Sequence, residues 1–285
     1  MLPTMNAYLA HSAAALLAGG NDGTMYSILQ QVGATASLVA SWDLGDAACW
    51  DGASQTITDR SGNGNHLFRG ATSGAEASDP TVSGSFVAGG KSANEYLSFD
   101  GGDFLRLAVA NPAGIEQMHK DGAKLCIQLY WRTAGSVGSN LAFCGDWGAV
   151  SHGFDWRFQA GATHEFRILA SGGVSFTKSP TAGLAVSTNL GQAVSLDENA
   201  GAAGGFFWKN GAYDQVSGPA DTWDPNYSAP SSSAASSTVE LFALGGGTSP
   251  ITNGARFYAG NIWSTNVSKA LLDAIHAQFG PRLSI

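Results

Sequence analysis

The stretch Asp59-Arg-Ser-Gly-Asn-Gly-Asn-His66 says more about the fold of this chain than any other segment. Its two glycines reach positive φ angles without steric cost, and its short Asp and Asn side chains form hydrogen bonds with nearby backbone groups. We therefore expect a compact turn that satisfies its own polar groups. Three interpretations of this turn are open: a cradle for a phosphate, a site for a metal ion, or a purely structural loop.

The phosphate interpretation fails on the spacing of the glycines. Gly62-Asn-Gly64 begins like the glycine-rich fingerprint of dinucleotide-binding proteins, but the third glycine of that pattern would fall at Leu67. No helix is predicted after the loop, so no helix N-terminus would hold a pyrophosphate. The loop is not a nucleotide cradle.

From Leu38 onward the apolar residues recur with a period of two, which predicts strands. The pair Asn210-Gly211 favours a hairpin turn of type I′ geometry. The segment 124–132 alternates only loosely, as expected for a strand enclosed between two layers. We predict an antiparallel two-sheet sandwich whose strands are 37–42, 95–98, 104–109, 124–132, 140–144, 154–159, 165–170, 174–177, 193–196, 205–209, 238–244 and 254–263.

Residues 1–35 differ from the rest of the chain and are predicted to form a helical arm. One helix begins at Thr4 and a second begins at Thr24, while Asp22 is the only formally charged side chain of the segment. An apolar arm of this kind needs a surface to cover it, either the chain's own body or another subunit, and we favour another subunit. The residues predicted to dock are Tyr8, Leu9, Leu16, Leu17, Ile28 and Leu29.

Two later segments lack the two-residue period of apolar residues that marks the strands. Residues 219–237 are rich in Pro, Ser and Ala and are predicted to form a long surface loop. Near the end of the chain Ser268 is placed to cap a helix, which Gly280-Pro281 terminates. No internal repeat is present, which disfavours solenoids and propellers. Residues 36–285 are predicted to form one domain.

Composition excludes several classes of function. A net charge of −8 with only 14 scattered Lys and Arg residues argues against nucleic acid as a partner. The odd count of 3 cysteines, without a C-x-x-C pair, predicts buried thiols rather than a disulfide framework or a zinc site. No segment has the pattern of a signal peptide or a membrane span, so we expect synthesis in a cytoplasm and no membrane insertion.

Enzyme chemistry is not indicated by any motif. The strand pattern Glu-x-Asp-x-(x)-Glu of glycosidases is absent, and the adjacent pair Asp197-Glu198 falls at a predicted turn. No G-x-S-x-G elbow occurs, and the 6 histidines show no metal-ligand spacing. We predict no catalytic residues and no enzymatic activity.

Three aromatic residues are the candidates for contact with a ligand or partner. Trp147, Trp223 and Tyr227 fall in predicted loops beside Gly, Asp and Asn. This mixture of residues stacks on and hydrogen-bonds a sugar ring, and it also occurs in protein interfaces. Ordinary anchoring of a loop is the third alternative. By contrast, Trp42, Trp131 and Trp263 lie on predicted strands and are expected in the core.

The order of several segments resembles laminin-G-like, concanavalin A-like jelly-roll domains. The residues that carry the resemblance begin with Trp42-Asp43, the loop 59–66, and Tyr96-Leu-Ser-Phe-Asp-Gly-Gly-Asp-Phe-Leu-Arg-Leu107. They continue with the segment 124–131, with Phe206-Phe-Trp-Lys-Asn-Gly211, and with the segment 254–263 and the helix after it. The resemblance covers residues 36 to 280 and implies two curved antiparallel sheets. It implies little about activity, because such domains bind sugars or proteins or act as spacers.

The resemblance also raises the question of calcium, which some relatives bind at the sheet rim. Oxygen ligands of the right kind are offered by Asp59, Asn63, Asp100 and Asp103, but no loop has EF-hand spacing. We therefore favour the interpretation in which these oxygens satisfy loop backbone groups and no cofactor is bound.

These observations lead to a prediction and two alternatives. We predict a non-enzymatic structural or adhesion protein of a bacteriophage virion, which contacts other virion subunits or itself through residues 1–35 and contacts protein or host-surface glycan through its jelly roll. The reasoning is that an extracellular type of domain with an apolar arm lacks a secretion signal. The first alternative is a stand-alone, extracellular carbohydrate-binding lectin, and the second is a glycoside-active enzyme.

Overall fold

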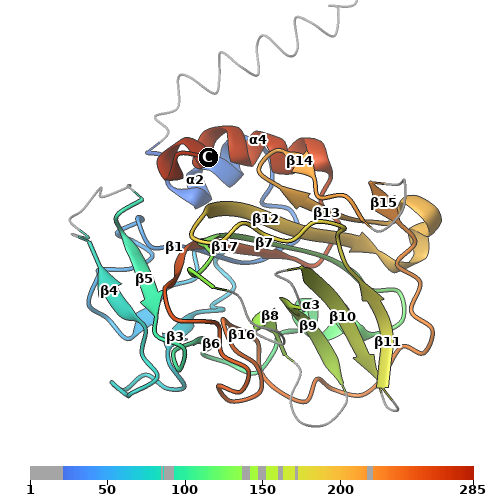
Figure 1. Cartoon of the computed structure of the whole chain (residues 1–285), viewed down its shortest axis with the longest axis horizontal. Helices are drawn as coiled ribbons and strands as arrows, with labels where there is room; N and C mark the ends of the chain where they lie inside the picture. The colour runs from blue at the N-terminus through green and yellow to red at the C-terminus, as the bar shows by residue number, and fades with distance from the viewer. Residues whose placement is uncertain are drawn as a thin grey trace, which may run out of the picture.

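The computed structural model describes residues 22–84, 86, 93–136, 142–146, 152–159, 163–170, 173–216 and 221–285. These residues form three layers (Figure 1): an eight-stranded sheet, a nine-stranded sheet, and two helices on the outer face of the nine-stranded sheet. The outer face of each sheet is defined here as the one that points away from the other sheet. Every pairing between strands of the described residues is antiparallel. The predicted fold class is confirmed.

The nine-stranded sheet is built around a long central strand. That strand, β7 (Lys124–Arg132), lies between β12 (Asn189–Asp197) and β17 (Ala255–Trp263). The other members are β1 (Leu38–Asp43), β4 (Thr81–Ser83), β5 (Tyr96–Phe99), β13 (Gly205–Lys209), β14 (Ala212–Tyr213) and β15 (Thr222–Trp223). The order is β14-β13-β12-β7-β17-β5-β4, and β1 pairs with β17 while β15 pairs with β13.

The eight-stranded sheet consists mainly of shorter strands. Its members are β2 (Thr56–Ile57), β3 (Leu67–Arg69), β6 (Leu105–Leu107), β8 (Ala142–Gly145), β9 (Gly153–Phe158), β10 (His164–Ala170), β11 (Gly173–Lys178) and β16 (Glu240–Leu241). They follow the order β11-β10-β9-β8-β16-β6-β3-β2. The prediction missed β2, β3, β4, β14 and β15, because pieces of two or three residues are too short to show a period.

The main core fills the space between the two sheets. Trp42, Trp131 and Trp156 are fully buried there, together with apolar residues from nearly every strand. Trp42 and Trp131 were predicted to be core residues, and Trp263 is also buried, although it faces the helices. Cys49, Cys126 and Cys144 are free, buried thiols, as predicted. Burial raises the pKa of the Cys126 thiol above its ordinary value.

A second core lies between the nine-stranded sheet and the helices α2 (Met25–Gln31) and α4 (Lys269–Phe279). Both helices begin where the sequence predicted. Thr24 Oγ1 accepts a hydrogen bond from Ser27 N at 3.3 Å, and Ser268 Oγ accepts one from Leu271 N at 3.3 Å. The α-helix α4 ends at Phe279, directly before the predicted terminator Gly280-Pro281, and the chain continues as the 3-10 helix η4 (Gly280–Leu283). No helix of the described residues is long and apolar enough to cross a membrane.

The second core corrects part of the predicted docking arm. Ile28 and Leu29 are fully buried against the chain's own sheet and α4, so they are not exposed to another subunit. The N–H of Met25 donates to Asp43 Oδ2 at 2.9 Å, and Arg282 Nη1 donates to Asp43 Oδ1 at 2.7 Å. This part of the arm belongs to the body of the protein. Tyr8, Leu9, Leu16 and Leu17 lie outside the described residues.

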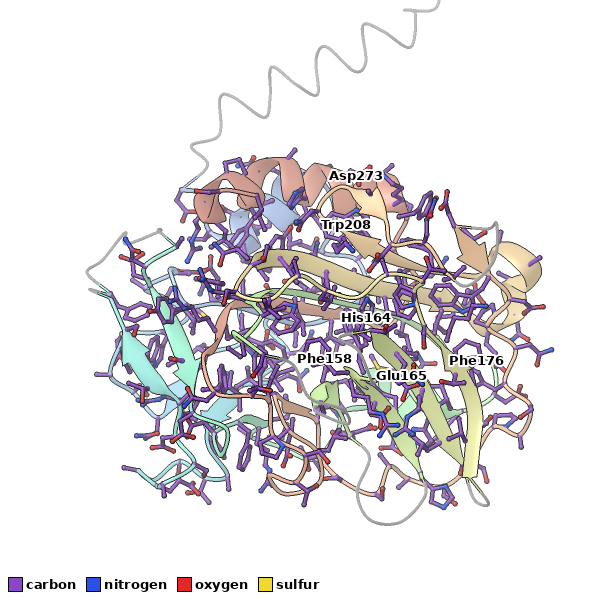
Figure 2. The ribbon with its side chains drawn as sticks, in the orientation of Figure 1. Phe158, His164, Glu165, Phe176, Trp208 and Asp273 are labelled. Carbon is purple, nitrogen blue, oxygen red and sulfur yellow. The ribbon has the colours of Figure 1, made fainter. Side chains whose placement is uncertain are left out.

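A buried polar bridge joins the two sheets at His164 (Figure 2). Trp156 Nε1 donates to His164 Nδ1 at 3.0 Å, which leaves the ring proton on Nε2, 3.0 Å from Asp214 Oδ2. Gln192, from the other sheet, places its Nε2 3.2 Å from His164 Nε2 and accepts from Trp131 Nε1 at 2.8 Å. Burial lowers the pKa of His164, an effect that Asp214 opposes.

Candidate functional site

The loop 59–66 covers the free edge of β1. Among the described strands β1 pairs with β17 alone, so the backbone groups on its other edge need partners. Asp59 Oδ1 accepts hydrogen bonds from Ser41 N at 2.9 Å and Ser61 N at 2.8 Å, and Asp59 Oδ2 accepts from Ser61 Oγ at 2.6 Å and Asn65 N at 3.0 Å. Arg60 N donates to Ser41 O at 2.9 Å. The loop therefore replaces a missing neighbouring strand.

The two asparagines of the loop complete this edge. Asn63 Nδ2 donates to Leu38 O at 2.8 Å, and Asn65 Nδ2 donates to Val39 O at 2.7 Å. Gly62 and Gly64 have φ angles of 89° and 76°, which is the left-handed region that favours glycine. The predicted self-satisfied turn is confirmed, and its partners include a strand that lies some 20 residues earlier in the chain.

A cleft of about 370 Å³ opens between this loop and three other segments. Its volume falls within the ~300–1,000 Å³ range of small-molecule sites. The cleft lies between the start of β1, the end of β17 and the start of the short helix α3 (Ala113–Glu116). Its lining residues are Ser37, Leu38, Val39, Asn63, Asn65, Pro112, Gly114 and Ser264.

Polar atoms without a protein partner line this cleft. The amide nitrogens of Asn63 and Asn65 are used by backbone carbonyls, but neither side-chain oxygen accepts a hydrogen bond from any described residue. The Ser37 hydroxyl is likewise unpaired in the described part of the chain, whereas its carbonyl accepts from Ser264 N at 2.9 Å. Two amide oxygens and a hydroxyl are thus available to a ligand rich in hydroxyl groups.

The floor of the cleft is tightly packed and apolar. A Cβ atom at Gly114 would meet Val39 Cγ2 at 2.8 Å and Ser264 Cβ at 3.1 Å, so a side chain at this position would displace its neighbours. Leu38, Val39 and Pro112 supply carbon surface next to the polar atoms. None of the lining residues is titratable, so the site offers hydrogen bonds and apolar contact but no side-chain acid or base.

A second cleft, of about 290 Å³, involves the long loop 219–237. It is lined by Lys120, Asp121, Pro230, Ser231 and Ser232. The 3-10 helix η1 (Gln117–His119) ends just before it. Lys120 forms an ion pair with Glu116 at 3.3 Å, so its charge is already partly compensated.

The predicted aromatic contact residues are placed in the core instead. Trp223 and Tyr227 are only 4% and 3% exposed. The ring of Trp223 lies 4.6 Å from that of Phe207. The ring of Tyr227 lies 5.6 Å from that of Phe176 (Figure 2) and is tilted to it by 46°, and the Tyr227 hydroxyl donates to Met118 O at 3.1 Å. The three alternatives for these residues were sugar contact, protein contact and anchoring of a loop. Trp223 and Tyr227 anchor a loop, because packing buries both faces of their rings. Trp147 lies outside the described residues.

The four candidate calcium ligands do not form one site. All four hydrogen bonds accepted by Asp59 come from protein donors, as described above. Its neighbour Ser41 pairs with Asn261 on β17, whereas Phe99, which precedes Asp100, pairs with Ala255. Six residues along a strand span ~20 Å, so Asp59 and Asn63 lie far from Asp100 and Asp103.

Asp100 and Asp103 accept hydrogen bonds from backbone groups of the turn that contains them. Asp103 Oδ2 accepts from Asp100 N at 2.9 Å, and Asp100 Oδ1 accepts from Gly102 N at 2.9 Å. Burial raises the pKa of Asp103 to about 6. Among the described residues no group of three or more His, Cys, Asp or Glu side chains could hold a metal ion.

A network of ion pairs on the outer face of the eight-stranded sheet was missed by the sequence reasoning. Asp155 on β9 opposes Arg167 on β10, and Arg157 on β9 opposes Glu165 on β10 (Figure 2). Positive and negative side chains therefore alternate along each strand and between the two strands. Arg167 Nε donates to Asp155 Oδ1 at 2.8 Å. Burial raises the pKa of Asp155, and Arg167 opposes this effect. The strict alternation of apolar and charged residues in 154–158 was the signal that could have placed these side chains on one face.

The comparisons with known proteins support the fold alone. No family model matches the chain, and no curated protein matches its sequence. Domain 4 of AbnA, a GH43 extracellular arabinanase from Geobacillus stearothermophilus solved in complex with arabinotriose, is similar with a TM-score of 0.54 and 12% identity, over 84% of this chain and 98% of that domain.

Two further solved structures share the architecture. The binding domain of Paraclostridial Mosquitocidal Protein 1 is similar with a TM-score of 0.54 and 8% identity, over 84% of this chain and 51% of that one. A Trypanosoma rangeli sialidase mutant with trans-sialidase activity is similar with a TM-score of 0.52 and 9% identity, over 86% of this chain and 34% of that one. This chain therefore spans about half and about a third of these two proteins. The concanavalin A-like sandwich resemblance is borne out at the level of fold.

Proposed function

We propose that this protein is a non-catalytic carbohydrate-binding module whose saccharide occupies the cleft beside the loop 59–66. The observation that carries the proposal is the set of unpaired polar atoms there: the side-chain oxygens of Asn63 and Asn65 and the hydroxyl of Ser37. Sugar hydroxyls donate to amide oxygens, while the carbon face of the ring packs on Leu38, Val39 and Pro112.

The fold neighbours give this proposal independent support. One of them is an arabinanase domain solved with arabinotriose, and another is the binding domain of a toxin. Identities of 12% and 8% transfer no binding residue, so the site proposed here rests on the residues of this chain. Of the functions predicted from the sequence, the carbohydrate-binding alternative thereby gains more support than the virion role.

A non-catalytic role is proposed because three carboxylates on the outer face of the eight-stranded sheet are paired with arginines. Asp155 and Glu165 are each bound by an arginine, and Glu240 is bound by Arg106. A retaining or inverting glycosidase needs one carboxyl as an acid and another as a base or nucleophile. The cleft itself contributes no titratable side chain.

The virion location stays a prediction from the sequence. Neither the fold nor the similar structures bear on it, and the same holds for docking through residues 1–21 and for an extracellular location. Carbohydrate binding is compatible with either setting, because a lectin and a virion adhesion protein use the same kind of contact.

A glycan array with two matched variants tests the proposal. Ser264→Gln places a longer side chain in the cleft, and Ser232→Gln places the same side chain in the second cleft. We expect the natural protein to bind at least one neutral oligosaccharide, including arabinan fragments, and Ser264→Gln to weaken that binding at least tenfold. Ser232→Gln should leave it unchanged.

Two results would overturn the proposal. The first is silence of the natural protein across a broad array of neutral and acidic glycans. The second is binding that Ser264→Gln leaves intact and Ser232→Gln abolishes, which would move the site to the second cleft. Circular dichroism of both variants establishes that each is folded.

A further inference from the structure

Two arginines on neighbouring strands face each other without a counter-ion. Arg132 ends β7 and Arg256 lies near the start of β17, and the two are direct partners in the antiparallel register. Side chains at directly opposed positions share one face of the sheet, with Cβ atoms ~5 Å apart, and like charges placed there destabilise a sheet. The pair therefore carries an electrostatic cost in the unliganded protein.

No Asp or Glu carboxylate of the described residues forms an ion pair with Arg132 or Arg256. Every Asp and Glu of the sequence falls within the described residues. Of the eight arginines, five form ion pairs with carboxylates, namely Arg60, Arg106, Arg157, Arg167 and Arg282. Arg69 donates to Pro80 O at 2.8 Å. The two that remain without a carboxylate in ion-pair contact are Arg132 and Arg256.

The neighbours across the sheet are neutral as well. Continuing the register outward, Asn189 opposes Arg132, Ser98 opposes Arg256, and Thr81 opposes Ser98. This row of five side chains holds two positive charges and no negative one. Both arginines are partly buried, so water screens their repulsion less than it would at a fully exposed position.

An aromatic side chain contacts Arg256. The guanidinium carbon of Arg256 lies 4.1 Å from the centre of the Tyr96 ring, and that ring makes an edge contact with Tyr258 at 5.9 Å. The Tyr258 hydroxyl donates to Asn189 Oδ1 at 3.1 Å. Burial raises the pKa of Tyr258, and the nearby charges of Arg256 and Arg132 oppose that shift. The Arg256 guanidinium thus lies on a preformed aromatic surface, and Arg132 is its direct partner across the register.

We propose that Arg132 and Arg256, flanked by Tyr96, Tyr258 and Asn189, form a binding site for the anionic group of an acidic saccharide. This inference rests on the proposed carbohydrate-binding function and adds a second subsite to it. A guanidinium fork binds a carboxylate or a sulfate through two parallel hydrogen bonds. One such group placed between the two arginines removes their repulsion, and Ser98, directly opposite Arg256, offers a hydroxyl for a ring hydroxyl.

Isothermal titration calorimetry with defined saccharides tests the site. The probes are tri-galacturonic acid, its fully methyl-esterified neutral form, and a heparin-derived tetrasaccharide that carries sulfate. The variants are Arg132→Gln and Arg256→Gln. The matched control is Lys178→Gln, because Lys178 also lacks an ion pair but lies on β11 in the other sheet.

We expect at least one acidic probe to bind more tightly than the methyl ester, and each arginine variant to weaken that binding at least tenfold, as loss of a charge-assisted pair implies. Lys178→Gln should change it less than twofold. Loss of tri-galacturonic acid binding in the arginine variants shows that a carboxylate is sufficient, whereas loss confined to the heparin-derived tetrasaccharide, which carries carboxylate and sulfate, shows that sulfate is required. Raising the salt concentration should weaken binding of the natural protein more than binding of the variants.

Three outcomes would overturn the inference. The ester could bind as tightly as the acid, the arginine variants could bind the acidic probes like the natural protein, or neither acidic probe could bind. If neutral glycans still bind in the array and Ser264→Gln abolishes this binding, the inference fails while the proposed function stands. If no glycan of any kind binds, both fail.

Discussion

The outer faces of the two sheets carry arginines in opposite electrostatic states. On the eight-stranded sheet Arg106, Arg157 and Arg167 each bind a carboxylate from a neighbouring strand. On the nine-stranded sheet Arg132 and Arg256 face each other without any carboxylate. The residue type and the strand setting are the same, so the difference lies in what the cross-strand neighbours provide.

This difference distinguishes arginines that stabilise the fold from arginines that are available to bind an anionic ligand. A guanidinium that is bound to a buried carboxylate cannot bind a ligand without breaking that pair, and breaking it leaves a buried charge. An unpaired guanidinium on an aromatic ring carries no such penalty and gains from any anion that arrives. Four substitutions test this difference between the two sheets, and they follow in order of decreasing expected effect on stability.

Glu240→Gln should have the largest effect on stability. Glu240 is fully buried, accepts from Arg106 Nε at 2.9 Å, and also accepts from the N–H groups of Gly246 and Gly247 at 3.0 and 3.1 Å. Removing one partner of a buried pair costs ~3–5 kcal/mol, and we expect about 3 kcal/mol because Arg106 is partly exposed. Urea denaturation measures the loss, and a loss below about 1 kcal/mol would contradict a structural role for this pair.

A pH titration of stability tests His164, which is fully buried and whose pKa is lowered by that burial. Because its pKa in the folded protein is below the unfolded value of ~6.5, the unfolded chain binds more protons as the pH falls through 6.5. The contribution of His164 to the free energy of unfolding should therefore be greatest above about pH 7 and fall below it. The total loss is ~1.4 kcal/mol for each unit by which folding lowers the pKa of His164.

The variant His164→Gln isolates this contribution. Its urea midpoint should depend less on pH between 7.5 and 5 than that of the natural protein, since His119 and His276 remain in both proteins with their pKa values also lowered by burial. Identical pH profiles of the two proteins would show that His164 does not titrate in this range.

Ser98→Glu converts the unpaired arginine site into a paired one. Ser98 lies directly opposite Arg256, so a carboxylate there should form a cross-strand ion pair and raise the free energy of unfolding by about 0.5 kcal/mol. The same change should abolish binding of acidic saccharides, because the carboxylate takes the place of the ligand. If this variant is more stable but binds acidic saccharides as tightly as the natural protein does, Arg256 is not part of the proposed binding site.

Arg132→Gln should have the smallest effect on stability and the opposite sign from Glu240→Gln. Relief of the repulsion with Arg256 should raise the free energy of unfolding by about 0.3 kcal/mol. Thermal unfolding at low and high salt checks this, since the gain should shrink when salt screens the charges. A clear destabilisation would mean that Arg132 has a structural partner after all.

Much of the fold could be predicted because its signals are local. The central strand was predicted with its observed bounds, 124–132, and the helices α2 and α4 begin after the predicted capping residues, Thr24 and Ser268. The turn at Asn210-Gly211 has φ angles of 46° and 84°, as type I′ geometry requires. Each of these features is set by residues within a few positions of one another.

The candidate sites were harder to predict because their residues meet only after folding. Trp223 and Tyr227 have the composition of contact residues, but packing on Phe207 and Phe176 decides their burial. The cleft joins Asn65 to Ser264, and the arginine pair joins positions 132 and 256. No pattern in the chain marks which strands become neighbours in the sheet.

The sequence alone determined that this protein is an antiparallel β sandwich and that the loop 59–66 is a turn with internal hydrogen bonds, because glycine conformations, caps and a period of two act over short distances. Tertiary structure alone decided that this loop closes the edge of β1 and borders a cleft, and that two arginines are left without a counter-ion. The register between strands fixes which charges meet, and it depends on contacts between residues far apart in the chain.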